Sequence, residues 1–283
     1  MAELGKPQVL AAGFTFLEAP RWHQGRLWFS DFYDHKVLAV DESGRVETVV
    51  EVPKQPSGLG WTREGALLIV SMLDKKLMRF DGGALKPFAD LSGIATGPCN
   101  DMVVDGKSRA YVGNFGYDRH NGEAPRNAAV ARVDPDGSVH VAAEDLAFPN
   151  GSVITPDGKT LIVAETFGSQ LTAFDIAADG SLSNRRTFAA MGQTRPDGIC
   201  LDAEGAVWVA DAGGGRAVRV REGGAIADTI SLSPRHAYAC MLGGNDGKTL
   251  FILTSSASGP ANAAKRDARV ETVRVSVPHA GLP

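Results

Sequence analysis

Short apolar runs separated by polar turns recur along the whole chain. Each repeat begins with a turn and continues into an alternating or apolar strand, as in HQGRLWFSD (23–31) and AEGAVWVAD (203–211). Asp-Gly and Glu-Gly pairs in the turns supply the positive φ angles of tight hairpins. The strands start about 40–50 residues apart, a spacing typical of propeller blades with four short strands. Six strand starts follow this spacing: Arg26, Ala66, Arg109, Thr160, Ala206 and Thr249.

The pattern therefore predicts an all-β fold, a six-bladed β-propeller that forms a single domain over residues 1–283. No segment has a sustained helical stripe. We expect the C-terminal strand at 271–277 to pair beside segment 7–13, because this closure leaves no open sheet edge. The longest interval, from 109 to 160, contains GNFGYDRHNGEAPRNAA and predicts a long loop over one face, where functional residues often lie.

A polar residue precedes four of the six strand starts by nearly the same distance, roughly eight to ten residues. This distance places the residue at the beginning of the innermost strand of its blade. Because equivalent positions around a ring point to one place, we expect the four side chains to meet at the mouth of the central channel. They are Glu18, Asn100, Asn150 and Asp197, while the other two blades have Ser57 or Gly58 and Cys240.

Two carboxylates and two amide oxygens that converge on one point predict a site for a hard cation. The set lacks the Cys and His ligands of structural zinc sites. We therefore expect a divalent metal ion, calcium first, with zinc, manganese and magnesium as alternatives. Four protein ligands would leave positions open for water and substrate. The competing interpretation is that Asn and Asp before Gly only form turns. The predicted metal ligands are Glu18, Asn100, Asn150 and Asp197.

Composition and charge narrow the range of partners and compartments. The net charge of −4 is spread along the chain without a basic tract, which argues against nucleic acid. No apolar run approaches the roughly 20 residues of a membrane helix, and the first residues lack the features of a signal peptide. Three widely spaced cysteines, expected as buried thiols, favour a cytoplasmic protein. The oligomeric state stays open.

The same segments resemble the regucalcin/gluconolactonase family, whose members are six-bladed calcium-dependent lactonases. LEAPRW (17–22) resembles the family motif G-E-[SG]-P-x-W, and CNDMVVD (99–105) resembles N-D-[GA]-x-x-D. FPNGSVITPDGKTLIVAET (148–166) and RPDGICLDAEGAVWVA (195–210) are also similar to family sequence. The resemblance spans about residues 14–256 and implies hydrolysis of a small-molecule lactone.

The resemblance also implies roles for individual residues. It implies a calcium ion bound by Glu18, Asn150 and Asp197, with Asn100 close to the ion or the substrate. The metal would polarise the lactone carbonyl, and Asp197 is the candidate base that takes a proton from water. Because a metal-bound carboxylate is a weak base, acidification of water by the metal is the alternative. The predicted catalytic residues are Asp197 and Asn100.

Other polar residues near these motifs allow two interpretations each. Asp101 either orients Asn100 or pairs with a nearby backbone amide. His120 in the long loop and His236 near the last innermost strand are either proton shuttles or ordinary histidines outside the chemistry.

A departure from the family bears on the substrate. Many sugar-lactone members have Arg two residues before the Asn of the N-D motif, where this chain has Pro98. Because Pro offers no donor to sugar hydroxyls, we predict that gluconolactone is a poor substrate and that a more apolar lactone is better. Aromatic residues near the innermost strands either line the pocket or pack between blades. The predicted substrate contacts are Asn100, Asp101, Phe16, Phe115, Tyr117 and Phe167.

Two other function classes fit the same fold. One is a lyase or isomerase on the same metal-centred propeller, since one fold hosts many chemistries. The other is a non-enzymatic propeller that binds protein or peptide partners. The shared metal position argues against the second, because a pure scaffold does not need it.

Overall fold

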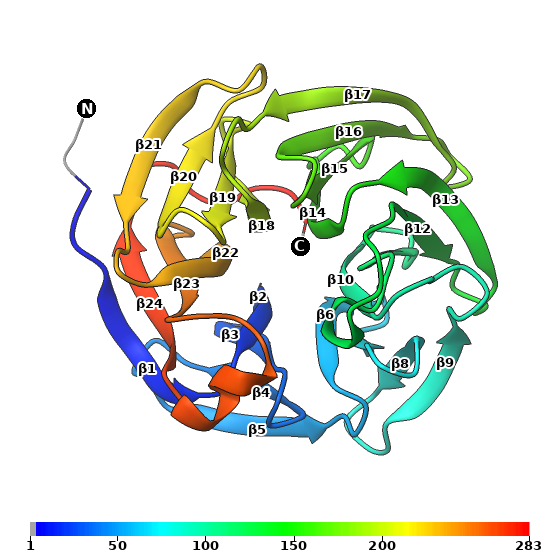
Figure 1. Cartoon of the computed structure of the whole chain (residues 1–283), viewed down its shortest axis with the longest axis horizontal. Helices are drawn as coiled ribbons and strands as arrows, with labels where there is room; N and C mark the ends of the chain where they lie inside the picture. The colour runs from blue at the N-terminus through cyan, green and yellow to red at the C-terminus, as the bar shows by residue number, and fades with distance from the viewer. Residues whose placement is uncertain (1–3, 283) are drawn as a thin grey trace.

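The computed structural model describes residues 4–282, apart from the side chain of His120. Its strands form six four-stranded antiparallel sheets, which are arranged as blades around a central axis (Figure 1). The prediction of an all-β, six-bladed β-propeller is confirmed. In the described part of the chain, no helix is long and apolar enough to cross a membrane.

The blades share one order, in which the first strand lies innermost and the fourth outermost. Blades one to three contain β2 (Leu17–His23), β3 (Arg26–Asp31), β4 (Lys36–Val40) and β5 (Val46–Glu51); β6 (Pro56–Trp61), β7 (Leu67–Ser71), β8 (Lys76–Phe80) and β9 (Lys86–Asp90); and β10 (Cys99–Val104), β11 (Ala110–Asn114), β12 (Ala128–Val133) and β13 (Val139–Leu146). Blades four to six contain β14 (Pro149–Ile154), β15 (Thr160–Glu165), β16 (Gln170–Ile176) and β17 (Leu182–Ala190); β18 (Pro196–Leu201), β19 (Val207–Asp211), β20 (Arg216–Val220) and β21 (Ile226–Ser231); and β22 (His236–Gly243), β23 (Thr249–Ser255), β24 (Ala268–Arg274) and β1 (Gln8–Phe14).

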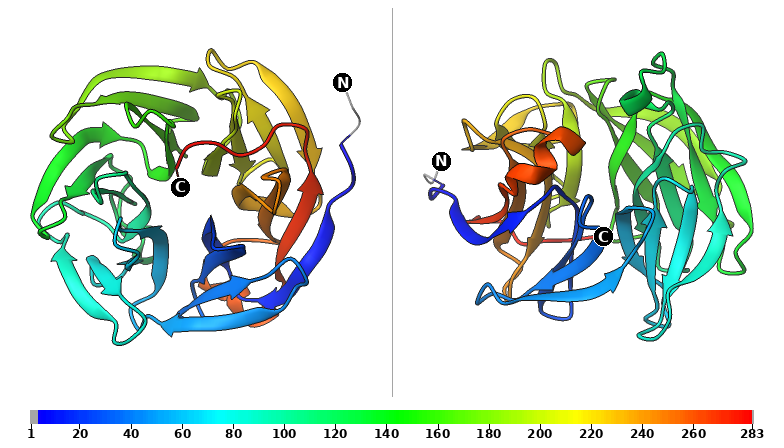
Figure 2. Two further views of the ribbon diagram at one scale, coloured as in Figure 1. Left: turned by 180° about the vertical axis from the view of Figure 1, so that it is seen from behind. Right: turned by 60° about the horizontal axis from the view of Figure 1, so that its bottom comes forward.

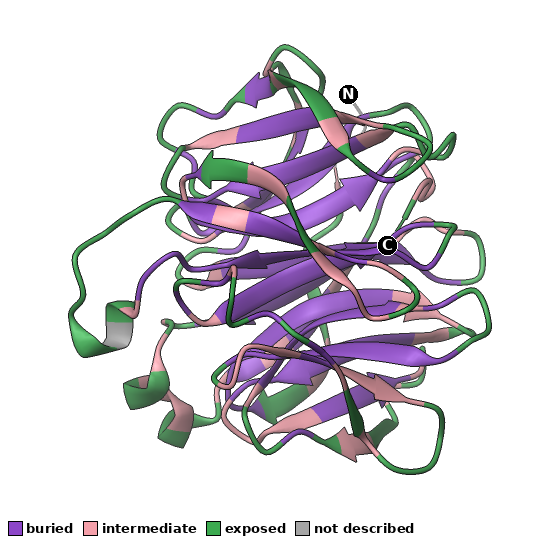
Figure 3. Cartoon of the chain, turned by 90° about the vertical axis from the view of Figure 1, so that its right-hand side faces the viewer, coloured by how far each residue is buried: buried purple, intermediate pink, exposed green. Residues whose placement is uncertain are grey.

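Burial falls from the axis to the rim, and the sequence follows this gradient. The second strand of blade five, β19, reads VWVAD and is buried at every position, as expected for a strand covered on both faces. The outer strand β5 reads VETVVE and is exposed or half-buried throughout. Figure 3 shows the same change from purple inner strands to green and pink outer ones. The apolar side chains of adjacent inner strands therefore form the core between blades.

The ring is closed by strands from the two ends of the chain. β1 pairs antiparallel with β24 as the outer strand of blade six, with Gln8 opposite Thr272. The predicted closure is confirmed, although β24 begins at Ala268 rather than at residue 271. Because β1 and β24 come from opposite ends of the sequence, their pairing joins the two ends of the chain in one blade, closes the ring of blades and covers a sheet edge.

The two faces of the propeller are covered differently. On one face, here called the front face, the loop at 115–127 carries the 3-10 helix η1 (Arg119–Asn121), and a second loop carries η2 (Pro260–Lys265). Figure 3 shows both short helices projecting from the same side. The prediction of a long loop between β11 and β12 is confirmed. On the back face the C-terminal tail runs inward past blades five and four (Figure 2), where His279 forms a bridge with Asp202 and Leu282 with Ile154.

The three cysteines are buried free thiols, as expected from the sequence. Cys200 and Cys240 come from the inner strands of blades five and six, and their sulfur atoms are 4.0 Å apart. Burial raises the pKa of the Cys99 thiol to about 12, so that thiol stays protonated and unreactive at neutral pH.

Candidate functional site

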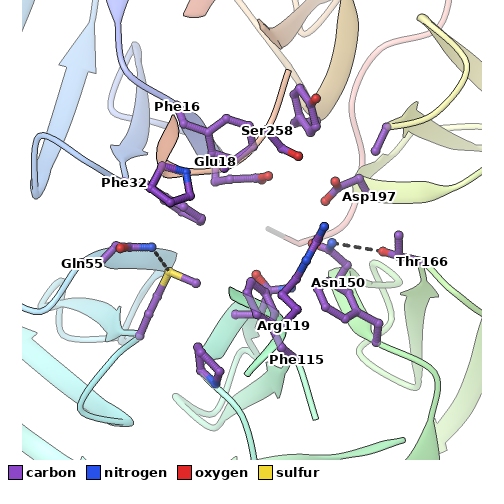
Figure 4. Close-up of a pocket in the computed structure, with 18 of the residues that line it drawn as sticks. Phe16, Glu18, Phe32, Gln55, Phe115, Arg119, Asn150, Thr166, Asp197 and Ser258 are labelled. Atoms are coloured by element: carbon purple, nitrogen blue, oxygen red, sulfur yellow. Dashed lines mark hydrogen bonds between the residues drawn. The ribbon is translucent and has the colours of Figure 1, made fainter. Parts of the chain in front are cut away.

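Four polar side chains from four blades line one pocket at the front end of the central channel. Each is the second residue of its inner strand, which is the position that the repeat predicted. The pocket has a volume of about 380 Å³, within the usual range for a small-molecule site. Figure 4 shows the carboxylates of Glu18 and Asp197 pointing toward one another across it. The four residues are Glu18, Asn100, Asn150 and Asp197.

The other two blades do not supply such a group. Ser57 is the second residue of β6, but it is not among the residues that line the pocket. In β22, the inner strand of blade six, the pocket residue is Tyr238, whereas the Cys240 thiol lies 3.5 and 3.4 Å from the Gly198 and Trp208 carbonyl oxygens. Counting back from Thr249 therefore misses the pocket position by two residues, because β22 is longer than the other inner strands.

The glycines that follow Asn150 and Asp197 are required by packing rather than by a turn. Asn150-Gly151 and Asp197-Gly198 lie within β14 and β18. A Cβ at Gly151 would lie 2.5 Å from the backbone nitrogen of Ile199, and one at Gly198 would lie 2.4 Å from the Ala239 Cβ. Inner strands of adjacent blades approach this closely around the axis. The turn interpretation of these pairs is therefore wrong.

A β-bulge lies at or directly after the candidate ligand in all four inner strands that supply one. The register of β14 against β15 shifts between Pro149 and Ser152, and that of β18 against β19 shifts between Pro196 and Ile199. Bulges re-aim side chains at the ends of sheets, where regular alternation would fix their direction. The repeated bulge therefore helps to direct the four donors into one pocket.

In the four blades that supply a candidate ligand, the last residue of the second strand fixes the loop that leads into the inner strand. Its side-chain oxygen accepts hydrogen bonds from backbone N–H groups just before the inner strand. Such bonds fix the loop without regular secondary structure. The pairs are Asp31 with Thr15 and Phe16, Asn114 with Gly97, Glu165 with Ala147, and Asp211 with Arg195.

The two asparagines have their amide nitrogens engaged by the protein. Asn100 Nδ2 donates to the Pro149 carbonyl oxygen at 3.2 Å, and Asn150 Nδ2 donates to Thr166 Oγ1 at 3.1 Å. Thr166 in turn donates to the Pro196 carbonyl oxygen at 2.7 Å, which fixes its hydroxyl as an acceptor for Asn150. Both amide oxygens are thus left for the pocket as potential cation ligands.

The carboxylates of Glu18 and Asp197 are buried, and their neighbours only partly offset the cost of burying these charges. Burial raises the pKa of Glu18 well above its usual range, and the charges of Asp197 and Asp101 raise it further. Burial also raises the pKa of Asp197, while the Asn150 amide and the Arg119 guanidinium act in the opposite direction. Asp197 Oδ1 has no hydrogen-bond partner among the described residues. A cation between the carboxylates would remove this cost.

The donor chemistry fits a hard divalent ion. Within residues 4–282, no three His, Cys, Asp or Glu side chains cluster closely enough to hold a metal. The candidate set instead combines two carboxylates with two neutral amide oxygens, a mixture that calcium accepts and structural zinc sites do not use.

Asp101 lies below the pocket rather than in its lining. Its Oδ1 accepts hydrogen bonds from Arg21 Nη2 at 2.7 Å and from the Met102 amide at 2.8 Å. Arg21 also donates to the Leu59 carbonyl oxygen at 3.0 Å, so it joins three blades across the channel. The structure therefore favours a structural ion pair and gives no support to a substrate contact by Asp101.

Aromatic side chains form two walls of the pocket. On one side Phe16 contacts Tyr238, with ring centroids 4.7 Å apart. On the other side Phe148 stacks on Phe115 at 4.5 Å and meets Phe167 at 4.7 Å. The lining thus includes Phe16, Phe115 and Phe167 from the predicted substrate contacts, together with Pro98 at the position of the family arginine.

Two other aromatic residues near the inner strands lie outside the lining. Tyr117, a predicted substrate contact, is buried and packs at 6.4 Å against Phe148. The structure therefore gives no support to a direct substrate contact by Tyr117. Phe14 contacts Phe29 in the core of blades one and six.

Several pocket residues were not identified from the sequence. Tyr33, Phe148 and Tyr238 add to the aromatic walls, and Arg119 and Arg195 bring positive charge to the lining. The polar composition of the long loop was the only signal for Arg119. His236 lies at the start of β22 outside the lining, and the side chain of His120 lies outside the described residues.

Comparison with known proteins gives the family. Residues 16–256 match the protein family described as SMP-30/Gluconolactonase/LRE-like region. Regucalcin from Xenopus laevis is 27% identical over 259 residues, which cover 89% of this chain and 86% of that protein. A 6-deoxy-6-sulfogluconolactonase from Pseudomonas putida is 26% identical over 246 residues, covering 84% of this chain and 82% of that one.

Known structures show the same fold. The crystal structure of regucalcin from Agrobacterium tumefaciens, a calcium-binding protein, has a TM-score of 0.82 and 21% sequence identity. The alignment covers 99% of this chain and 97% of that chain. The resemblance noted from the motifs is confirmed, and the chain belongs to the SMP-30/gluconolactonase/LRE-like family.

Proposed function

We propose that this protein is a divalent-metal-dependent lactonase that acts at the front pocket. The observation that carries the proposal is the buried Asp197 carboxylate, which faces Glu18 and has an oxygen without a partner in the described structure. Buried charge of this kind is costly unless a ligand completes the site. Membership of a family with a named lactonase among its relatives supports the reaction class.

The chain's own residues would divide the work as follows. Glu18, Asn150 and Asp197 would hold the ion, with Asn100 close enough to share in binding it or the substrate. A divalent ion bound there, calcium by its donor chemistry, supplies the charge that polarises a lactone carbonyl. Asp197 lines the pocket and its Oδ1 has no partner in the described structure, so this carboxylate would be the group that accepts a proton from an attacking water molecule. The aromatic walls would hold the apolar part of the lactone and limit the access of bulk water.

The lining favours a lactone that is more apolar than gluconolactone. Pro98 lines the pocket and offers no hydrogen bond to a sugar hydroxyl. Phe16 and Phe148 instead bring aromatic rings to the lining, against which a hydrocarbon or aromatic group can pack.

The test compares two substrates with and without a chelator. Purified protein is assayed on gluconolactone and on an aromatic γ-lactone, and the product mass is measured. We expect a product heavier than the substrate by one water, loss of activity with chelator, and better catalytic efficiency on the aromatic lactone. A product of unchanged mass would instead indicate isomerase chemistry.

Variants localise the reaction to the pocket. Asp197→Asn should reduce the hydrolysis of both lactones by about a hundred- to a thousandfold, whereas Asp136→Asn, in an exposed turn between β12 and β13, should leave it unchanged. Full activity in the Asp197 variant, or activity that resists exhaustive chelation, would contradict the proposal.

A further inference from the structure

We propose that the preferred substrate carries a carboxylate, which Arg119 and Arg195 bind at the mouth of the pocket. This inference rests on the proposed lactonase function and deepens it by naming the substrate class. The class is a lactone with a flat apolar body and one anionic arm.

Both arginines belong to the pocket, although they come from different blades. Arg119 lies in η1, in the long loop of blade three, and Arg195 immediately precedes β18 of blade five. Both side chains are among the residues that line the cavity. Figure 4 shows Arg119 reaching from its loop toward Asp197 and Asn150. The pocket mouth is therefore cationic, while its floor holds the two carboxylates.

Neither arginine forms a close ion pair in the described structure, although Arg119 lies near enough to Asp197 to lower the pKa of that carboxyl group. In the described part of the chain, no carboxylate oxygen lies within 4.0 Å of a side-chain nitrogen of Arg119 or Arg195. Other arginines near the same face behave differently: Arg216 pairs with Asp211 at 3.0 Å and Arg235 with Glu271 at 3.4 Å. The two pocket arginines are thus available for an anion from outside.

An aromatic row leads along one wall to Arg195. The guanidinium carbon of Arg195 lies 5.8 Å from the centroid of Phe167, over its ring. Phe167 contacts Phe148, which stacks on Phe115. A flat apolar group lying on this row would bring a substituent at its end to Arg195.

The chemistry of guanidinium favours a carboxylate over a neutral polar group. Arginine presents several N–H donors in a plane, and these match the two oxygens of a carboxylate. Hydrogen bonds to charged groups are stronger than those to neutral ones. A positive mouth also attracts anionic substrates over a distance set by the ionic strength. A neutral sugar lactone would use none of these features.

The experiment uses two lactones that differ only in charge. An aryl γ-lactone with a carboxylate substituent is compared with its primary amide, which has the same shape. We expect kcat/KM to be about ten- to hundredfold higher for the carboxylate, and most of this preference to be lost in Arg119→Gln/Arg195→Gln. Arg119→Lys, which keeps the charge, should retain more of the preference than Arg119→Gln. Added salt should raise KM for the carboxylate only.

A matched control is an exposed arginine on the opposite face. Arg45, in the turn between β4 and β5, pairs weakly with Asp41 at 3.4 Å and is not a pocket residue. Arg45→Gln should leave the ratio of the two catalytic efficiencies unchanged.

The outcomes separate this inference from the proposed reaction. Hydrolysis of both lactones at equal efficiency in the wild-type protein would overturn the anion site and leave the lactonase function standing. Hydrolysis of neither lactone would overturn the lactonase function, and calorimetry with a non-hydrolysable lactam carboxylate then decides the anion site. Binding that weakens in the double variant supports the site, and binding that is absent or unaffected overturns it.

Discussion

Two buried aspartates near the channel axis have opposite surroundings. Asp101 in β10 is 5% exposed and Asp197 in β18 is 7% exposed, and burial raises the pKa of both carboxyl groups. Asp101 is compensated by Arg21 and by the Met102 amide. Asp197 faces a second carboxylate, and one of its oxygens has no partner in the described structure. The difference therefore lies in the compensation of the charge and not in its burial.

The comparison separates a structural charge from a functional one. The buried ion pair of Arg21 and Asp101, with its hydrogen bonds satisfied, joins the inner strands of three blades. A buried carboxylate left open toward a cavity costs stability, and proteins retain such groups where a ligand or a reaction needs them. Each prediction below changes one side of this comparison.

The largest expected effect follows from breaking the ion pair. Arg21→Met should lower the free energy of unfolding by about 3–5 kcal/mol, because Asp101 is left buried without its counterion. Urea denaturation measures the loss. The double variant Arg21→Met/Asp101→Leu should recover much of it, and Arg45→Met at the exposed pair with Asp41 should have little effect on stability. An Arg21→Met variant as stable as the wild type would show that the ion pair does not stabilise the fold.

Substitution of a carboxylate at the pocket floor should change the activity rather than the stability of the protein. Asp197→Asn should reduce kcat/KM by about a hundred- to a thousandfold, because it removes a ligand and the candidate base. Its unfolding free energy should stay the same or rise, since a buried charge without a partner is removed. Kinetics and denaturation on one preparation measure both.

Calorimetric titration with calcium separates the two roles of Asp197. If Asp197 transfers a proton in addition to binding the metal, Asp197→Asn should lower the calcium affinity less than Glu18→Gln does. Equal loss of affinity and activity in both variants would make Asp197 a ligand only.

Calcium should stabilise the fold by binding at the Glu18 and Asp197 carboxylates, and the Arg21–Asp101 ion pair should not be needed for this effect. At a hundredfold excess over Kd, binding adds about 2.7 kcal/mol, which corresponds to roughly 5–10 °C in Tm. Chelator should reverse the shift, and Glu18→Gln should abolish it. Asp101→Asn should keep the shift on top of its lower starting stability. A Tm that is insensitive to calcium and chelator would contradict metal binding by the two pocket carboxylates.

The smallest effect is expected from Thr166, which orients the candidate metal ligand Asn150. Thr166→Val removes the acceptor of the Asn150 amide while keeping the shape of the side chain. We expect about a tenfold loss of calcium affinity, because the orientation of Asn150 is no longer fixed. Thr160→Val at the other end of β15 serves as the control. Unchanged affinity in Thr166→Val would mean that packing alone orients Asn150.

Local sequence determined the repeat and most of the site. Turn glycines, apolar strands and their spacing predict six blades, and the closure by the chain ends follows from the need to protect sheet edges. The same repeat places Glu18, Asn100, Asn150 and Asp197 at equivalent positions, and the structure brings all four to one pocket. The metal, the catalytic roles and the substrate remain predictions.

Only the tertiary structure decided which buried charges are paired and which aromatic residues face the pocket. Asp101 is compensated by Arg21, 80 residues away in another blade, and no local pattern records that contact. Tyr117 and Phe148 lie in similar loops, yet only Phe148 reaches the lining. Arg119 and Arg195 meet at the pocket because the ring brings blades three and five to one axis. Local sequence determines strands and turns, whereas such partners depend on how distant blades close around the channel.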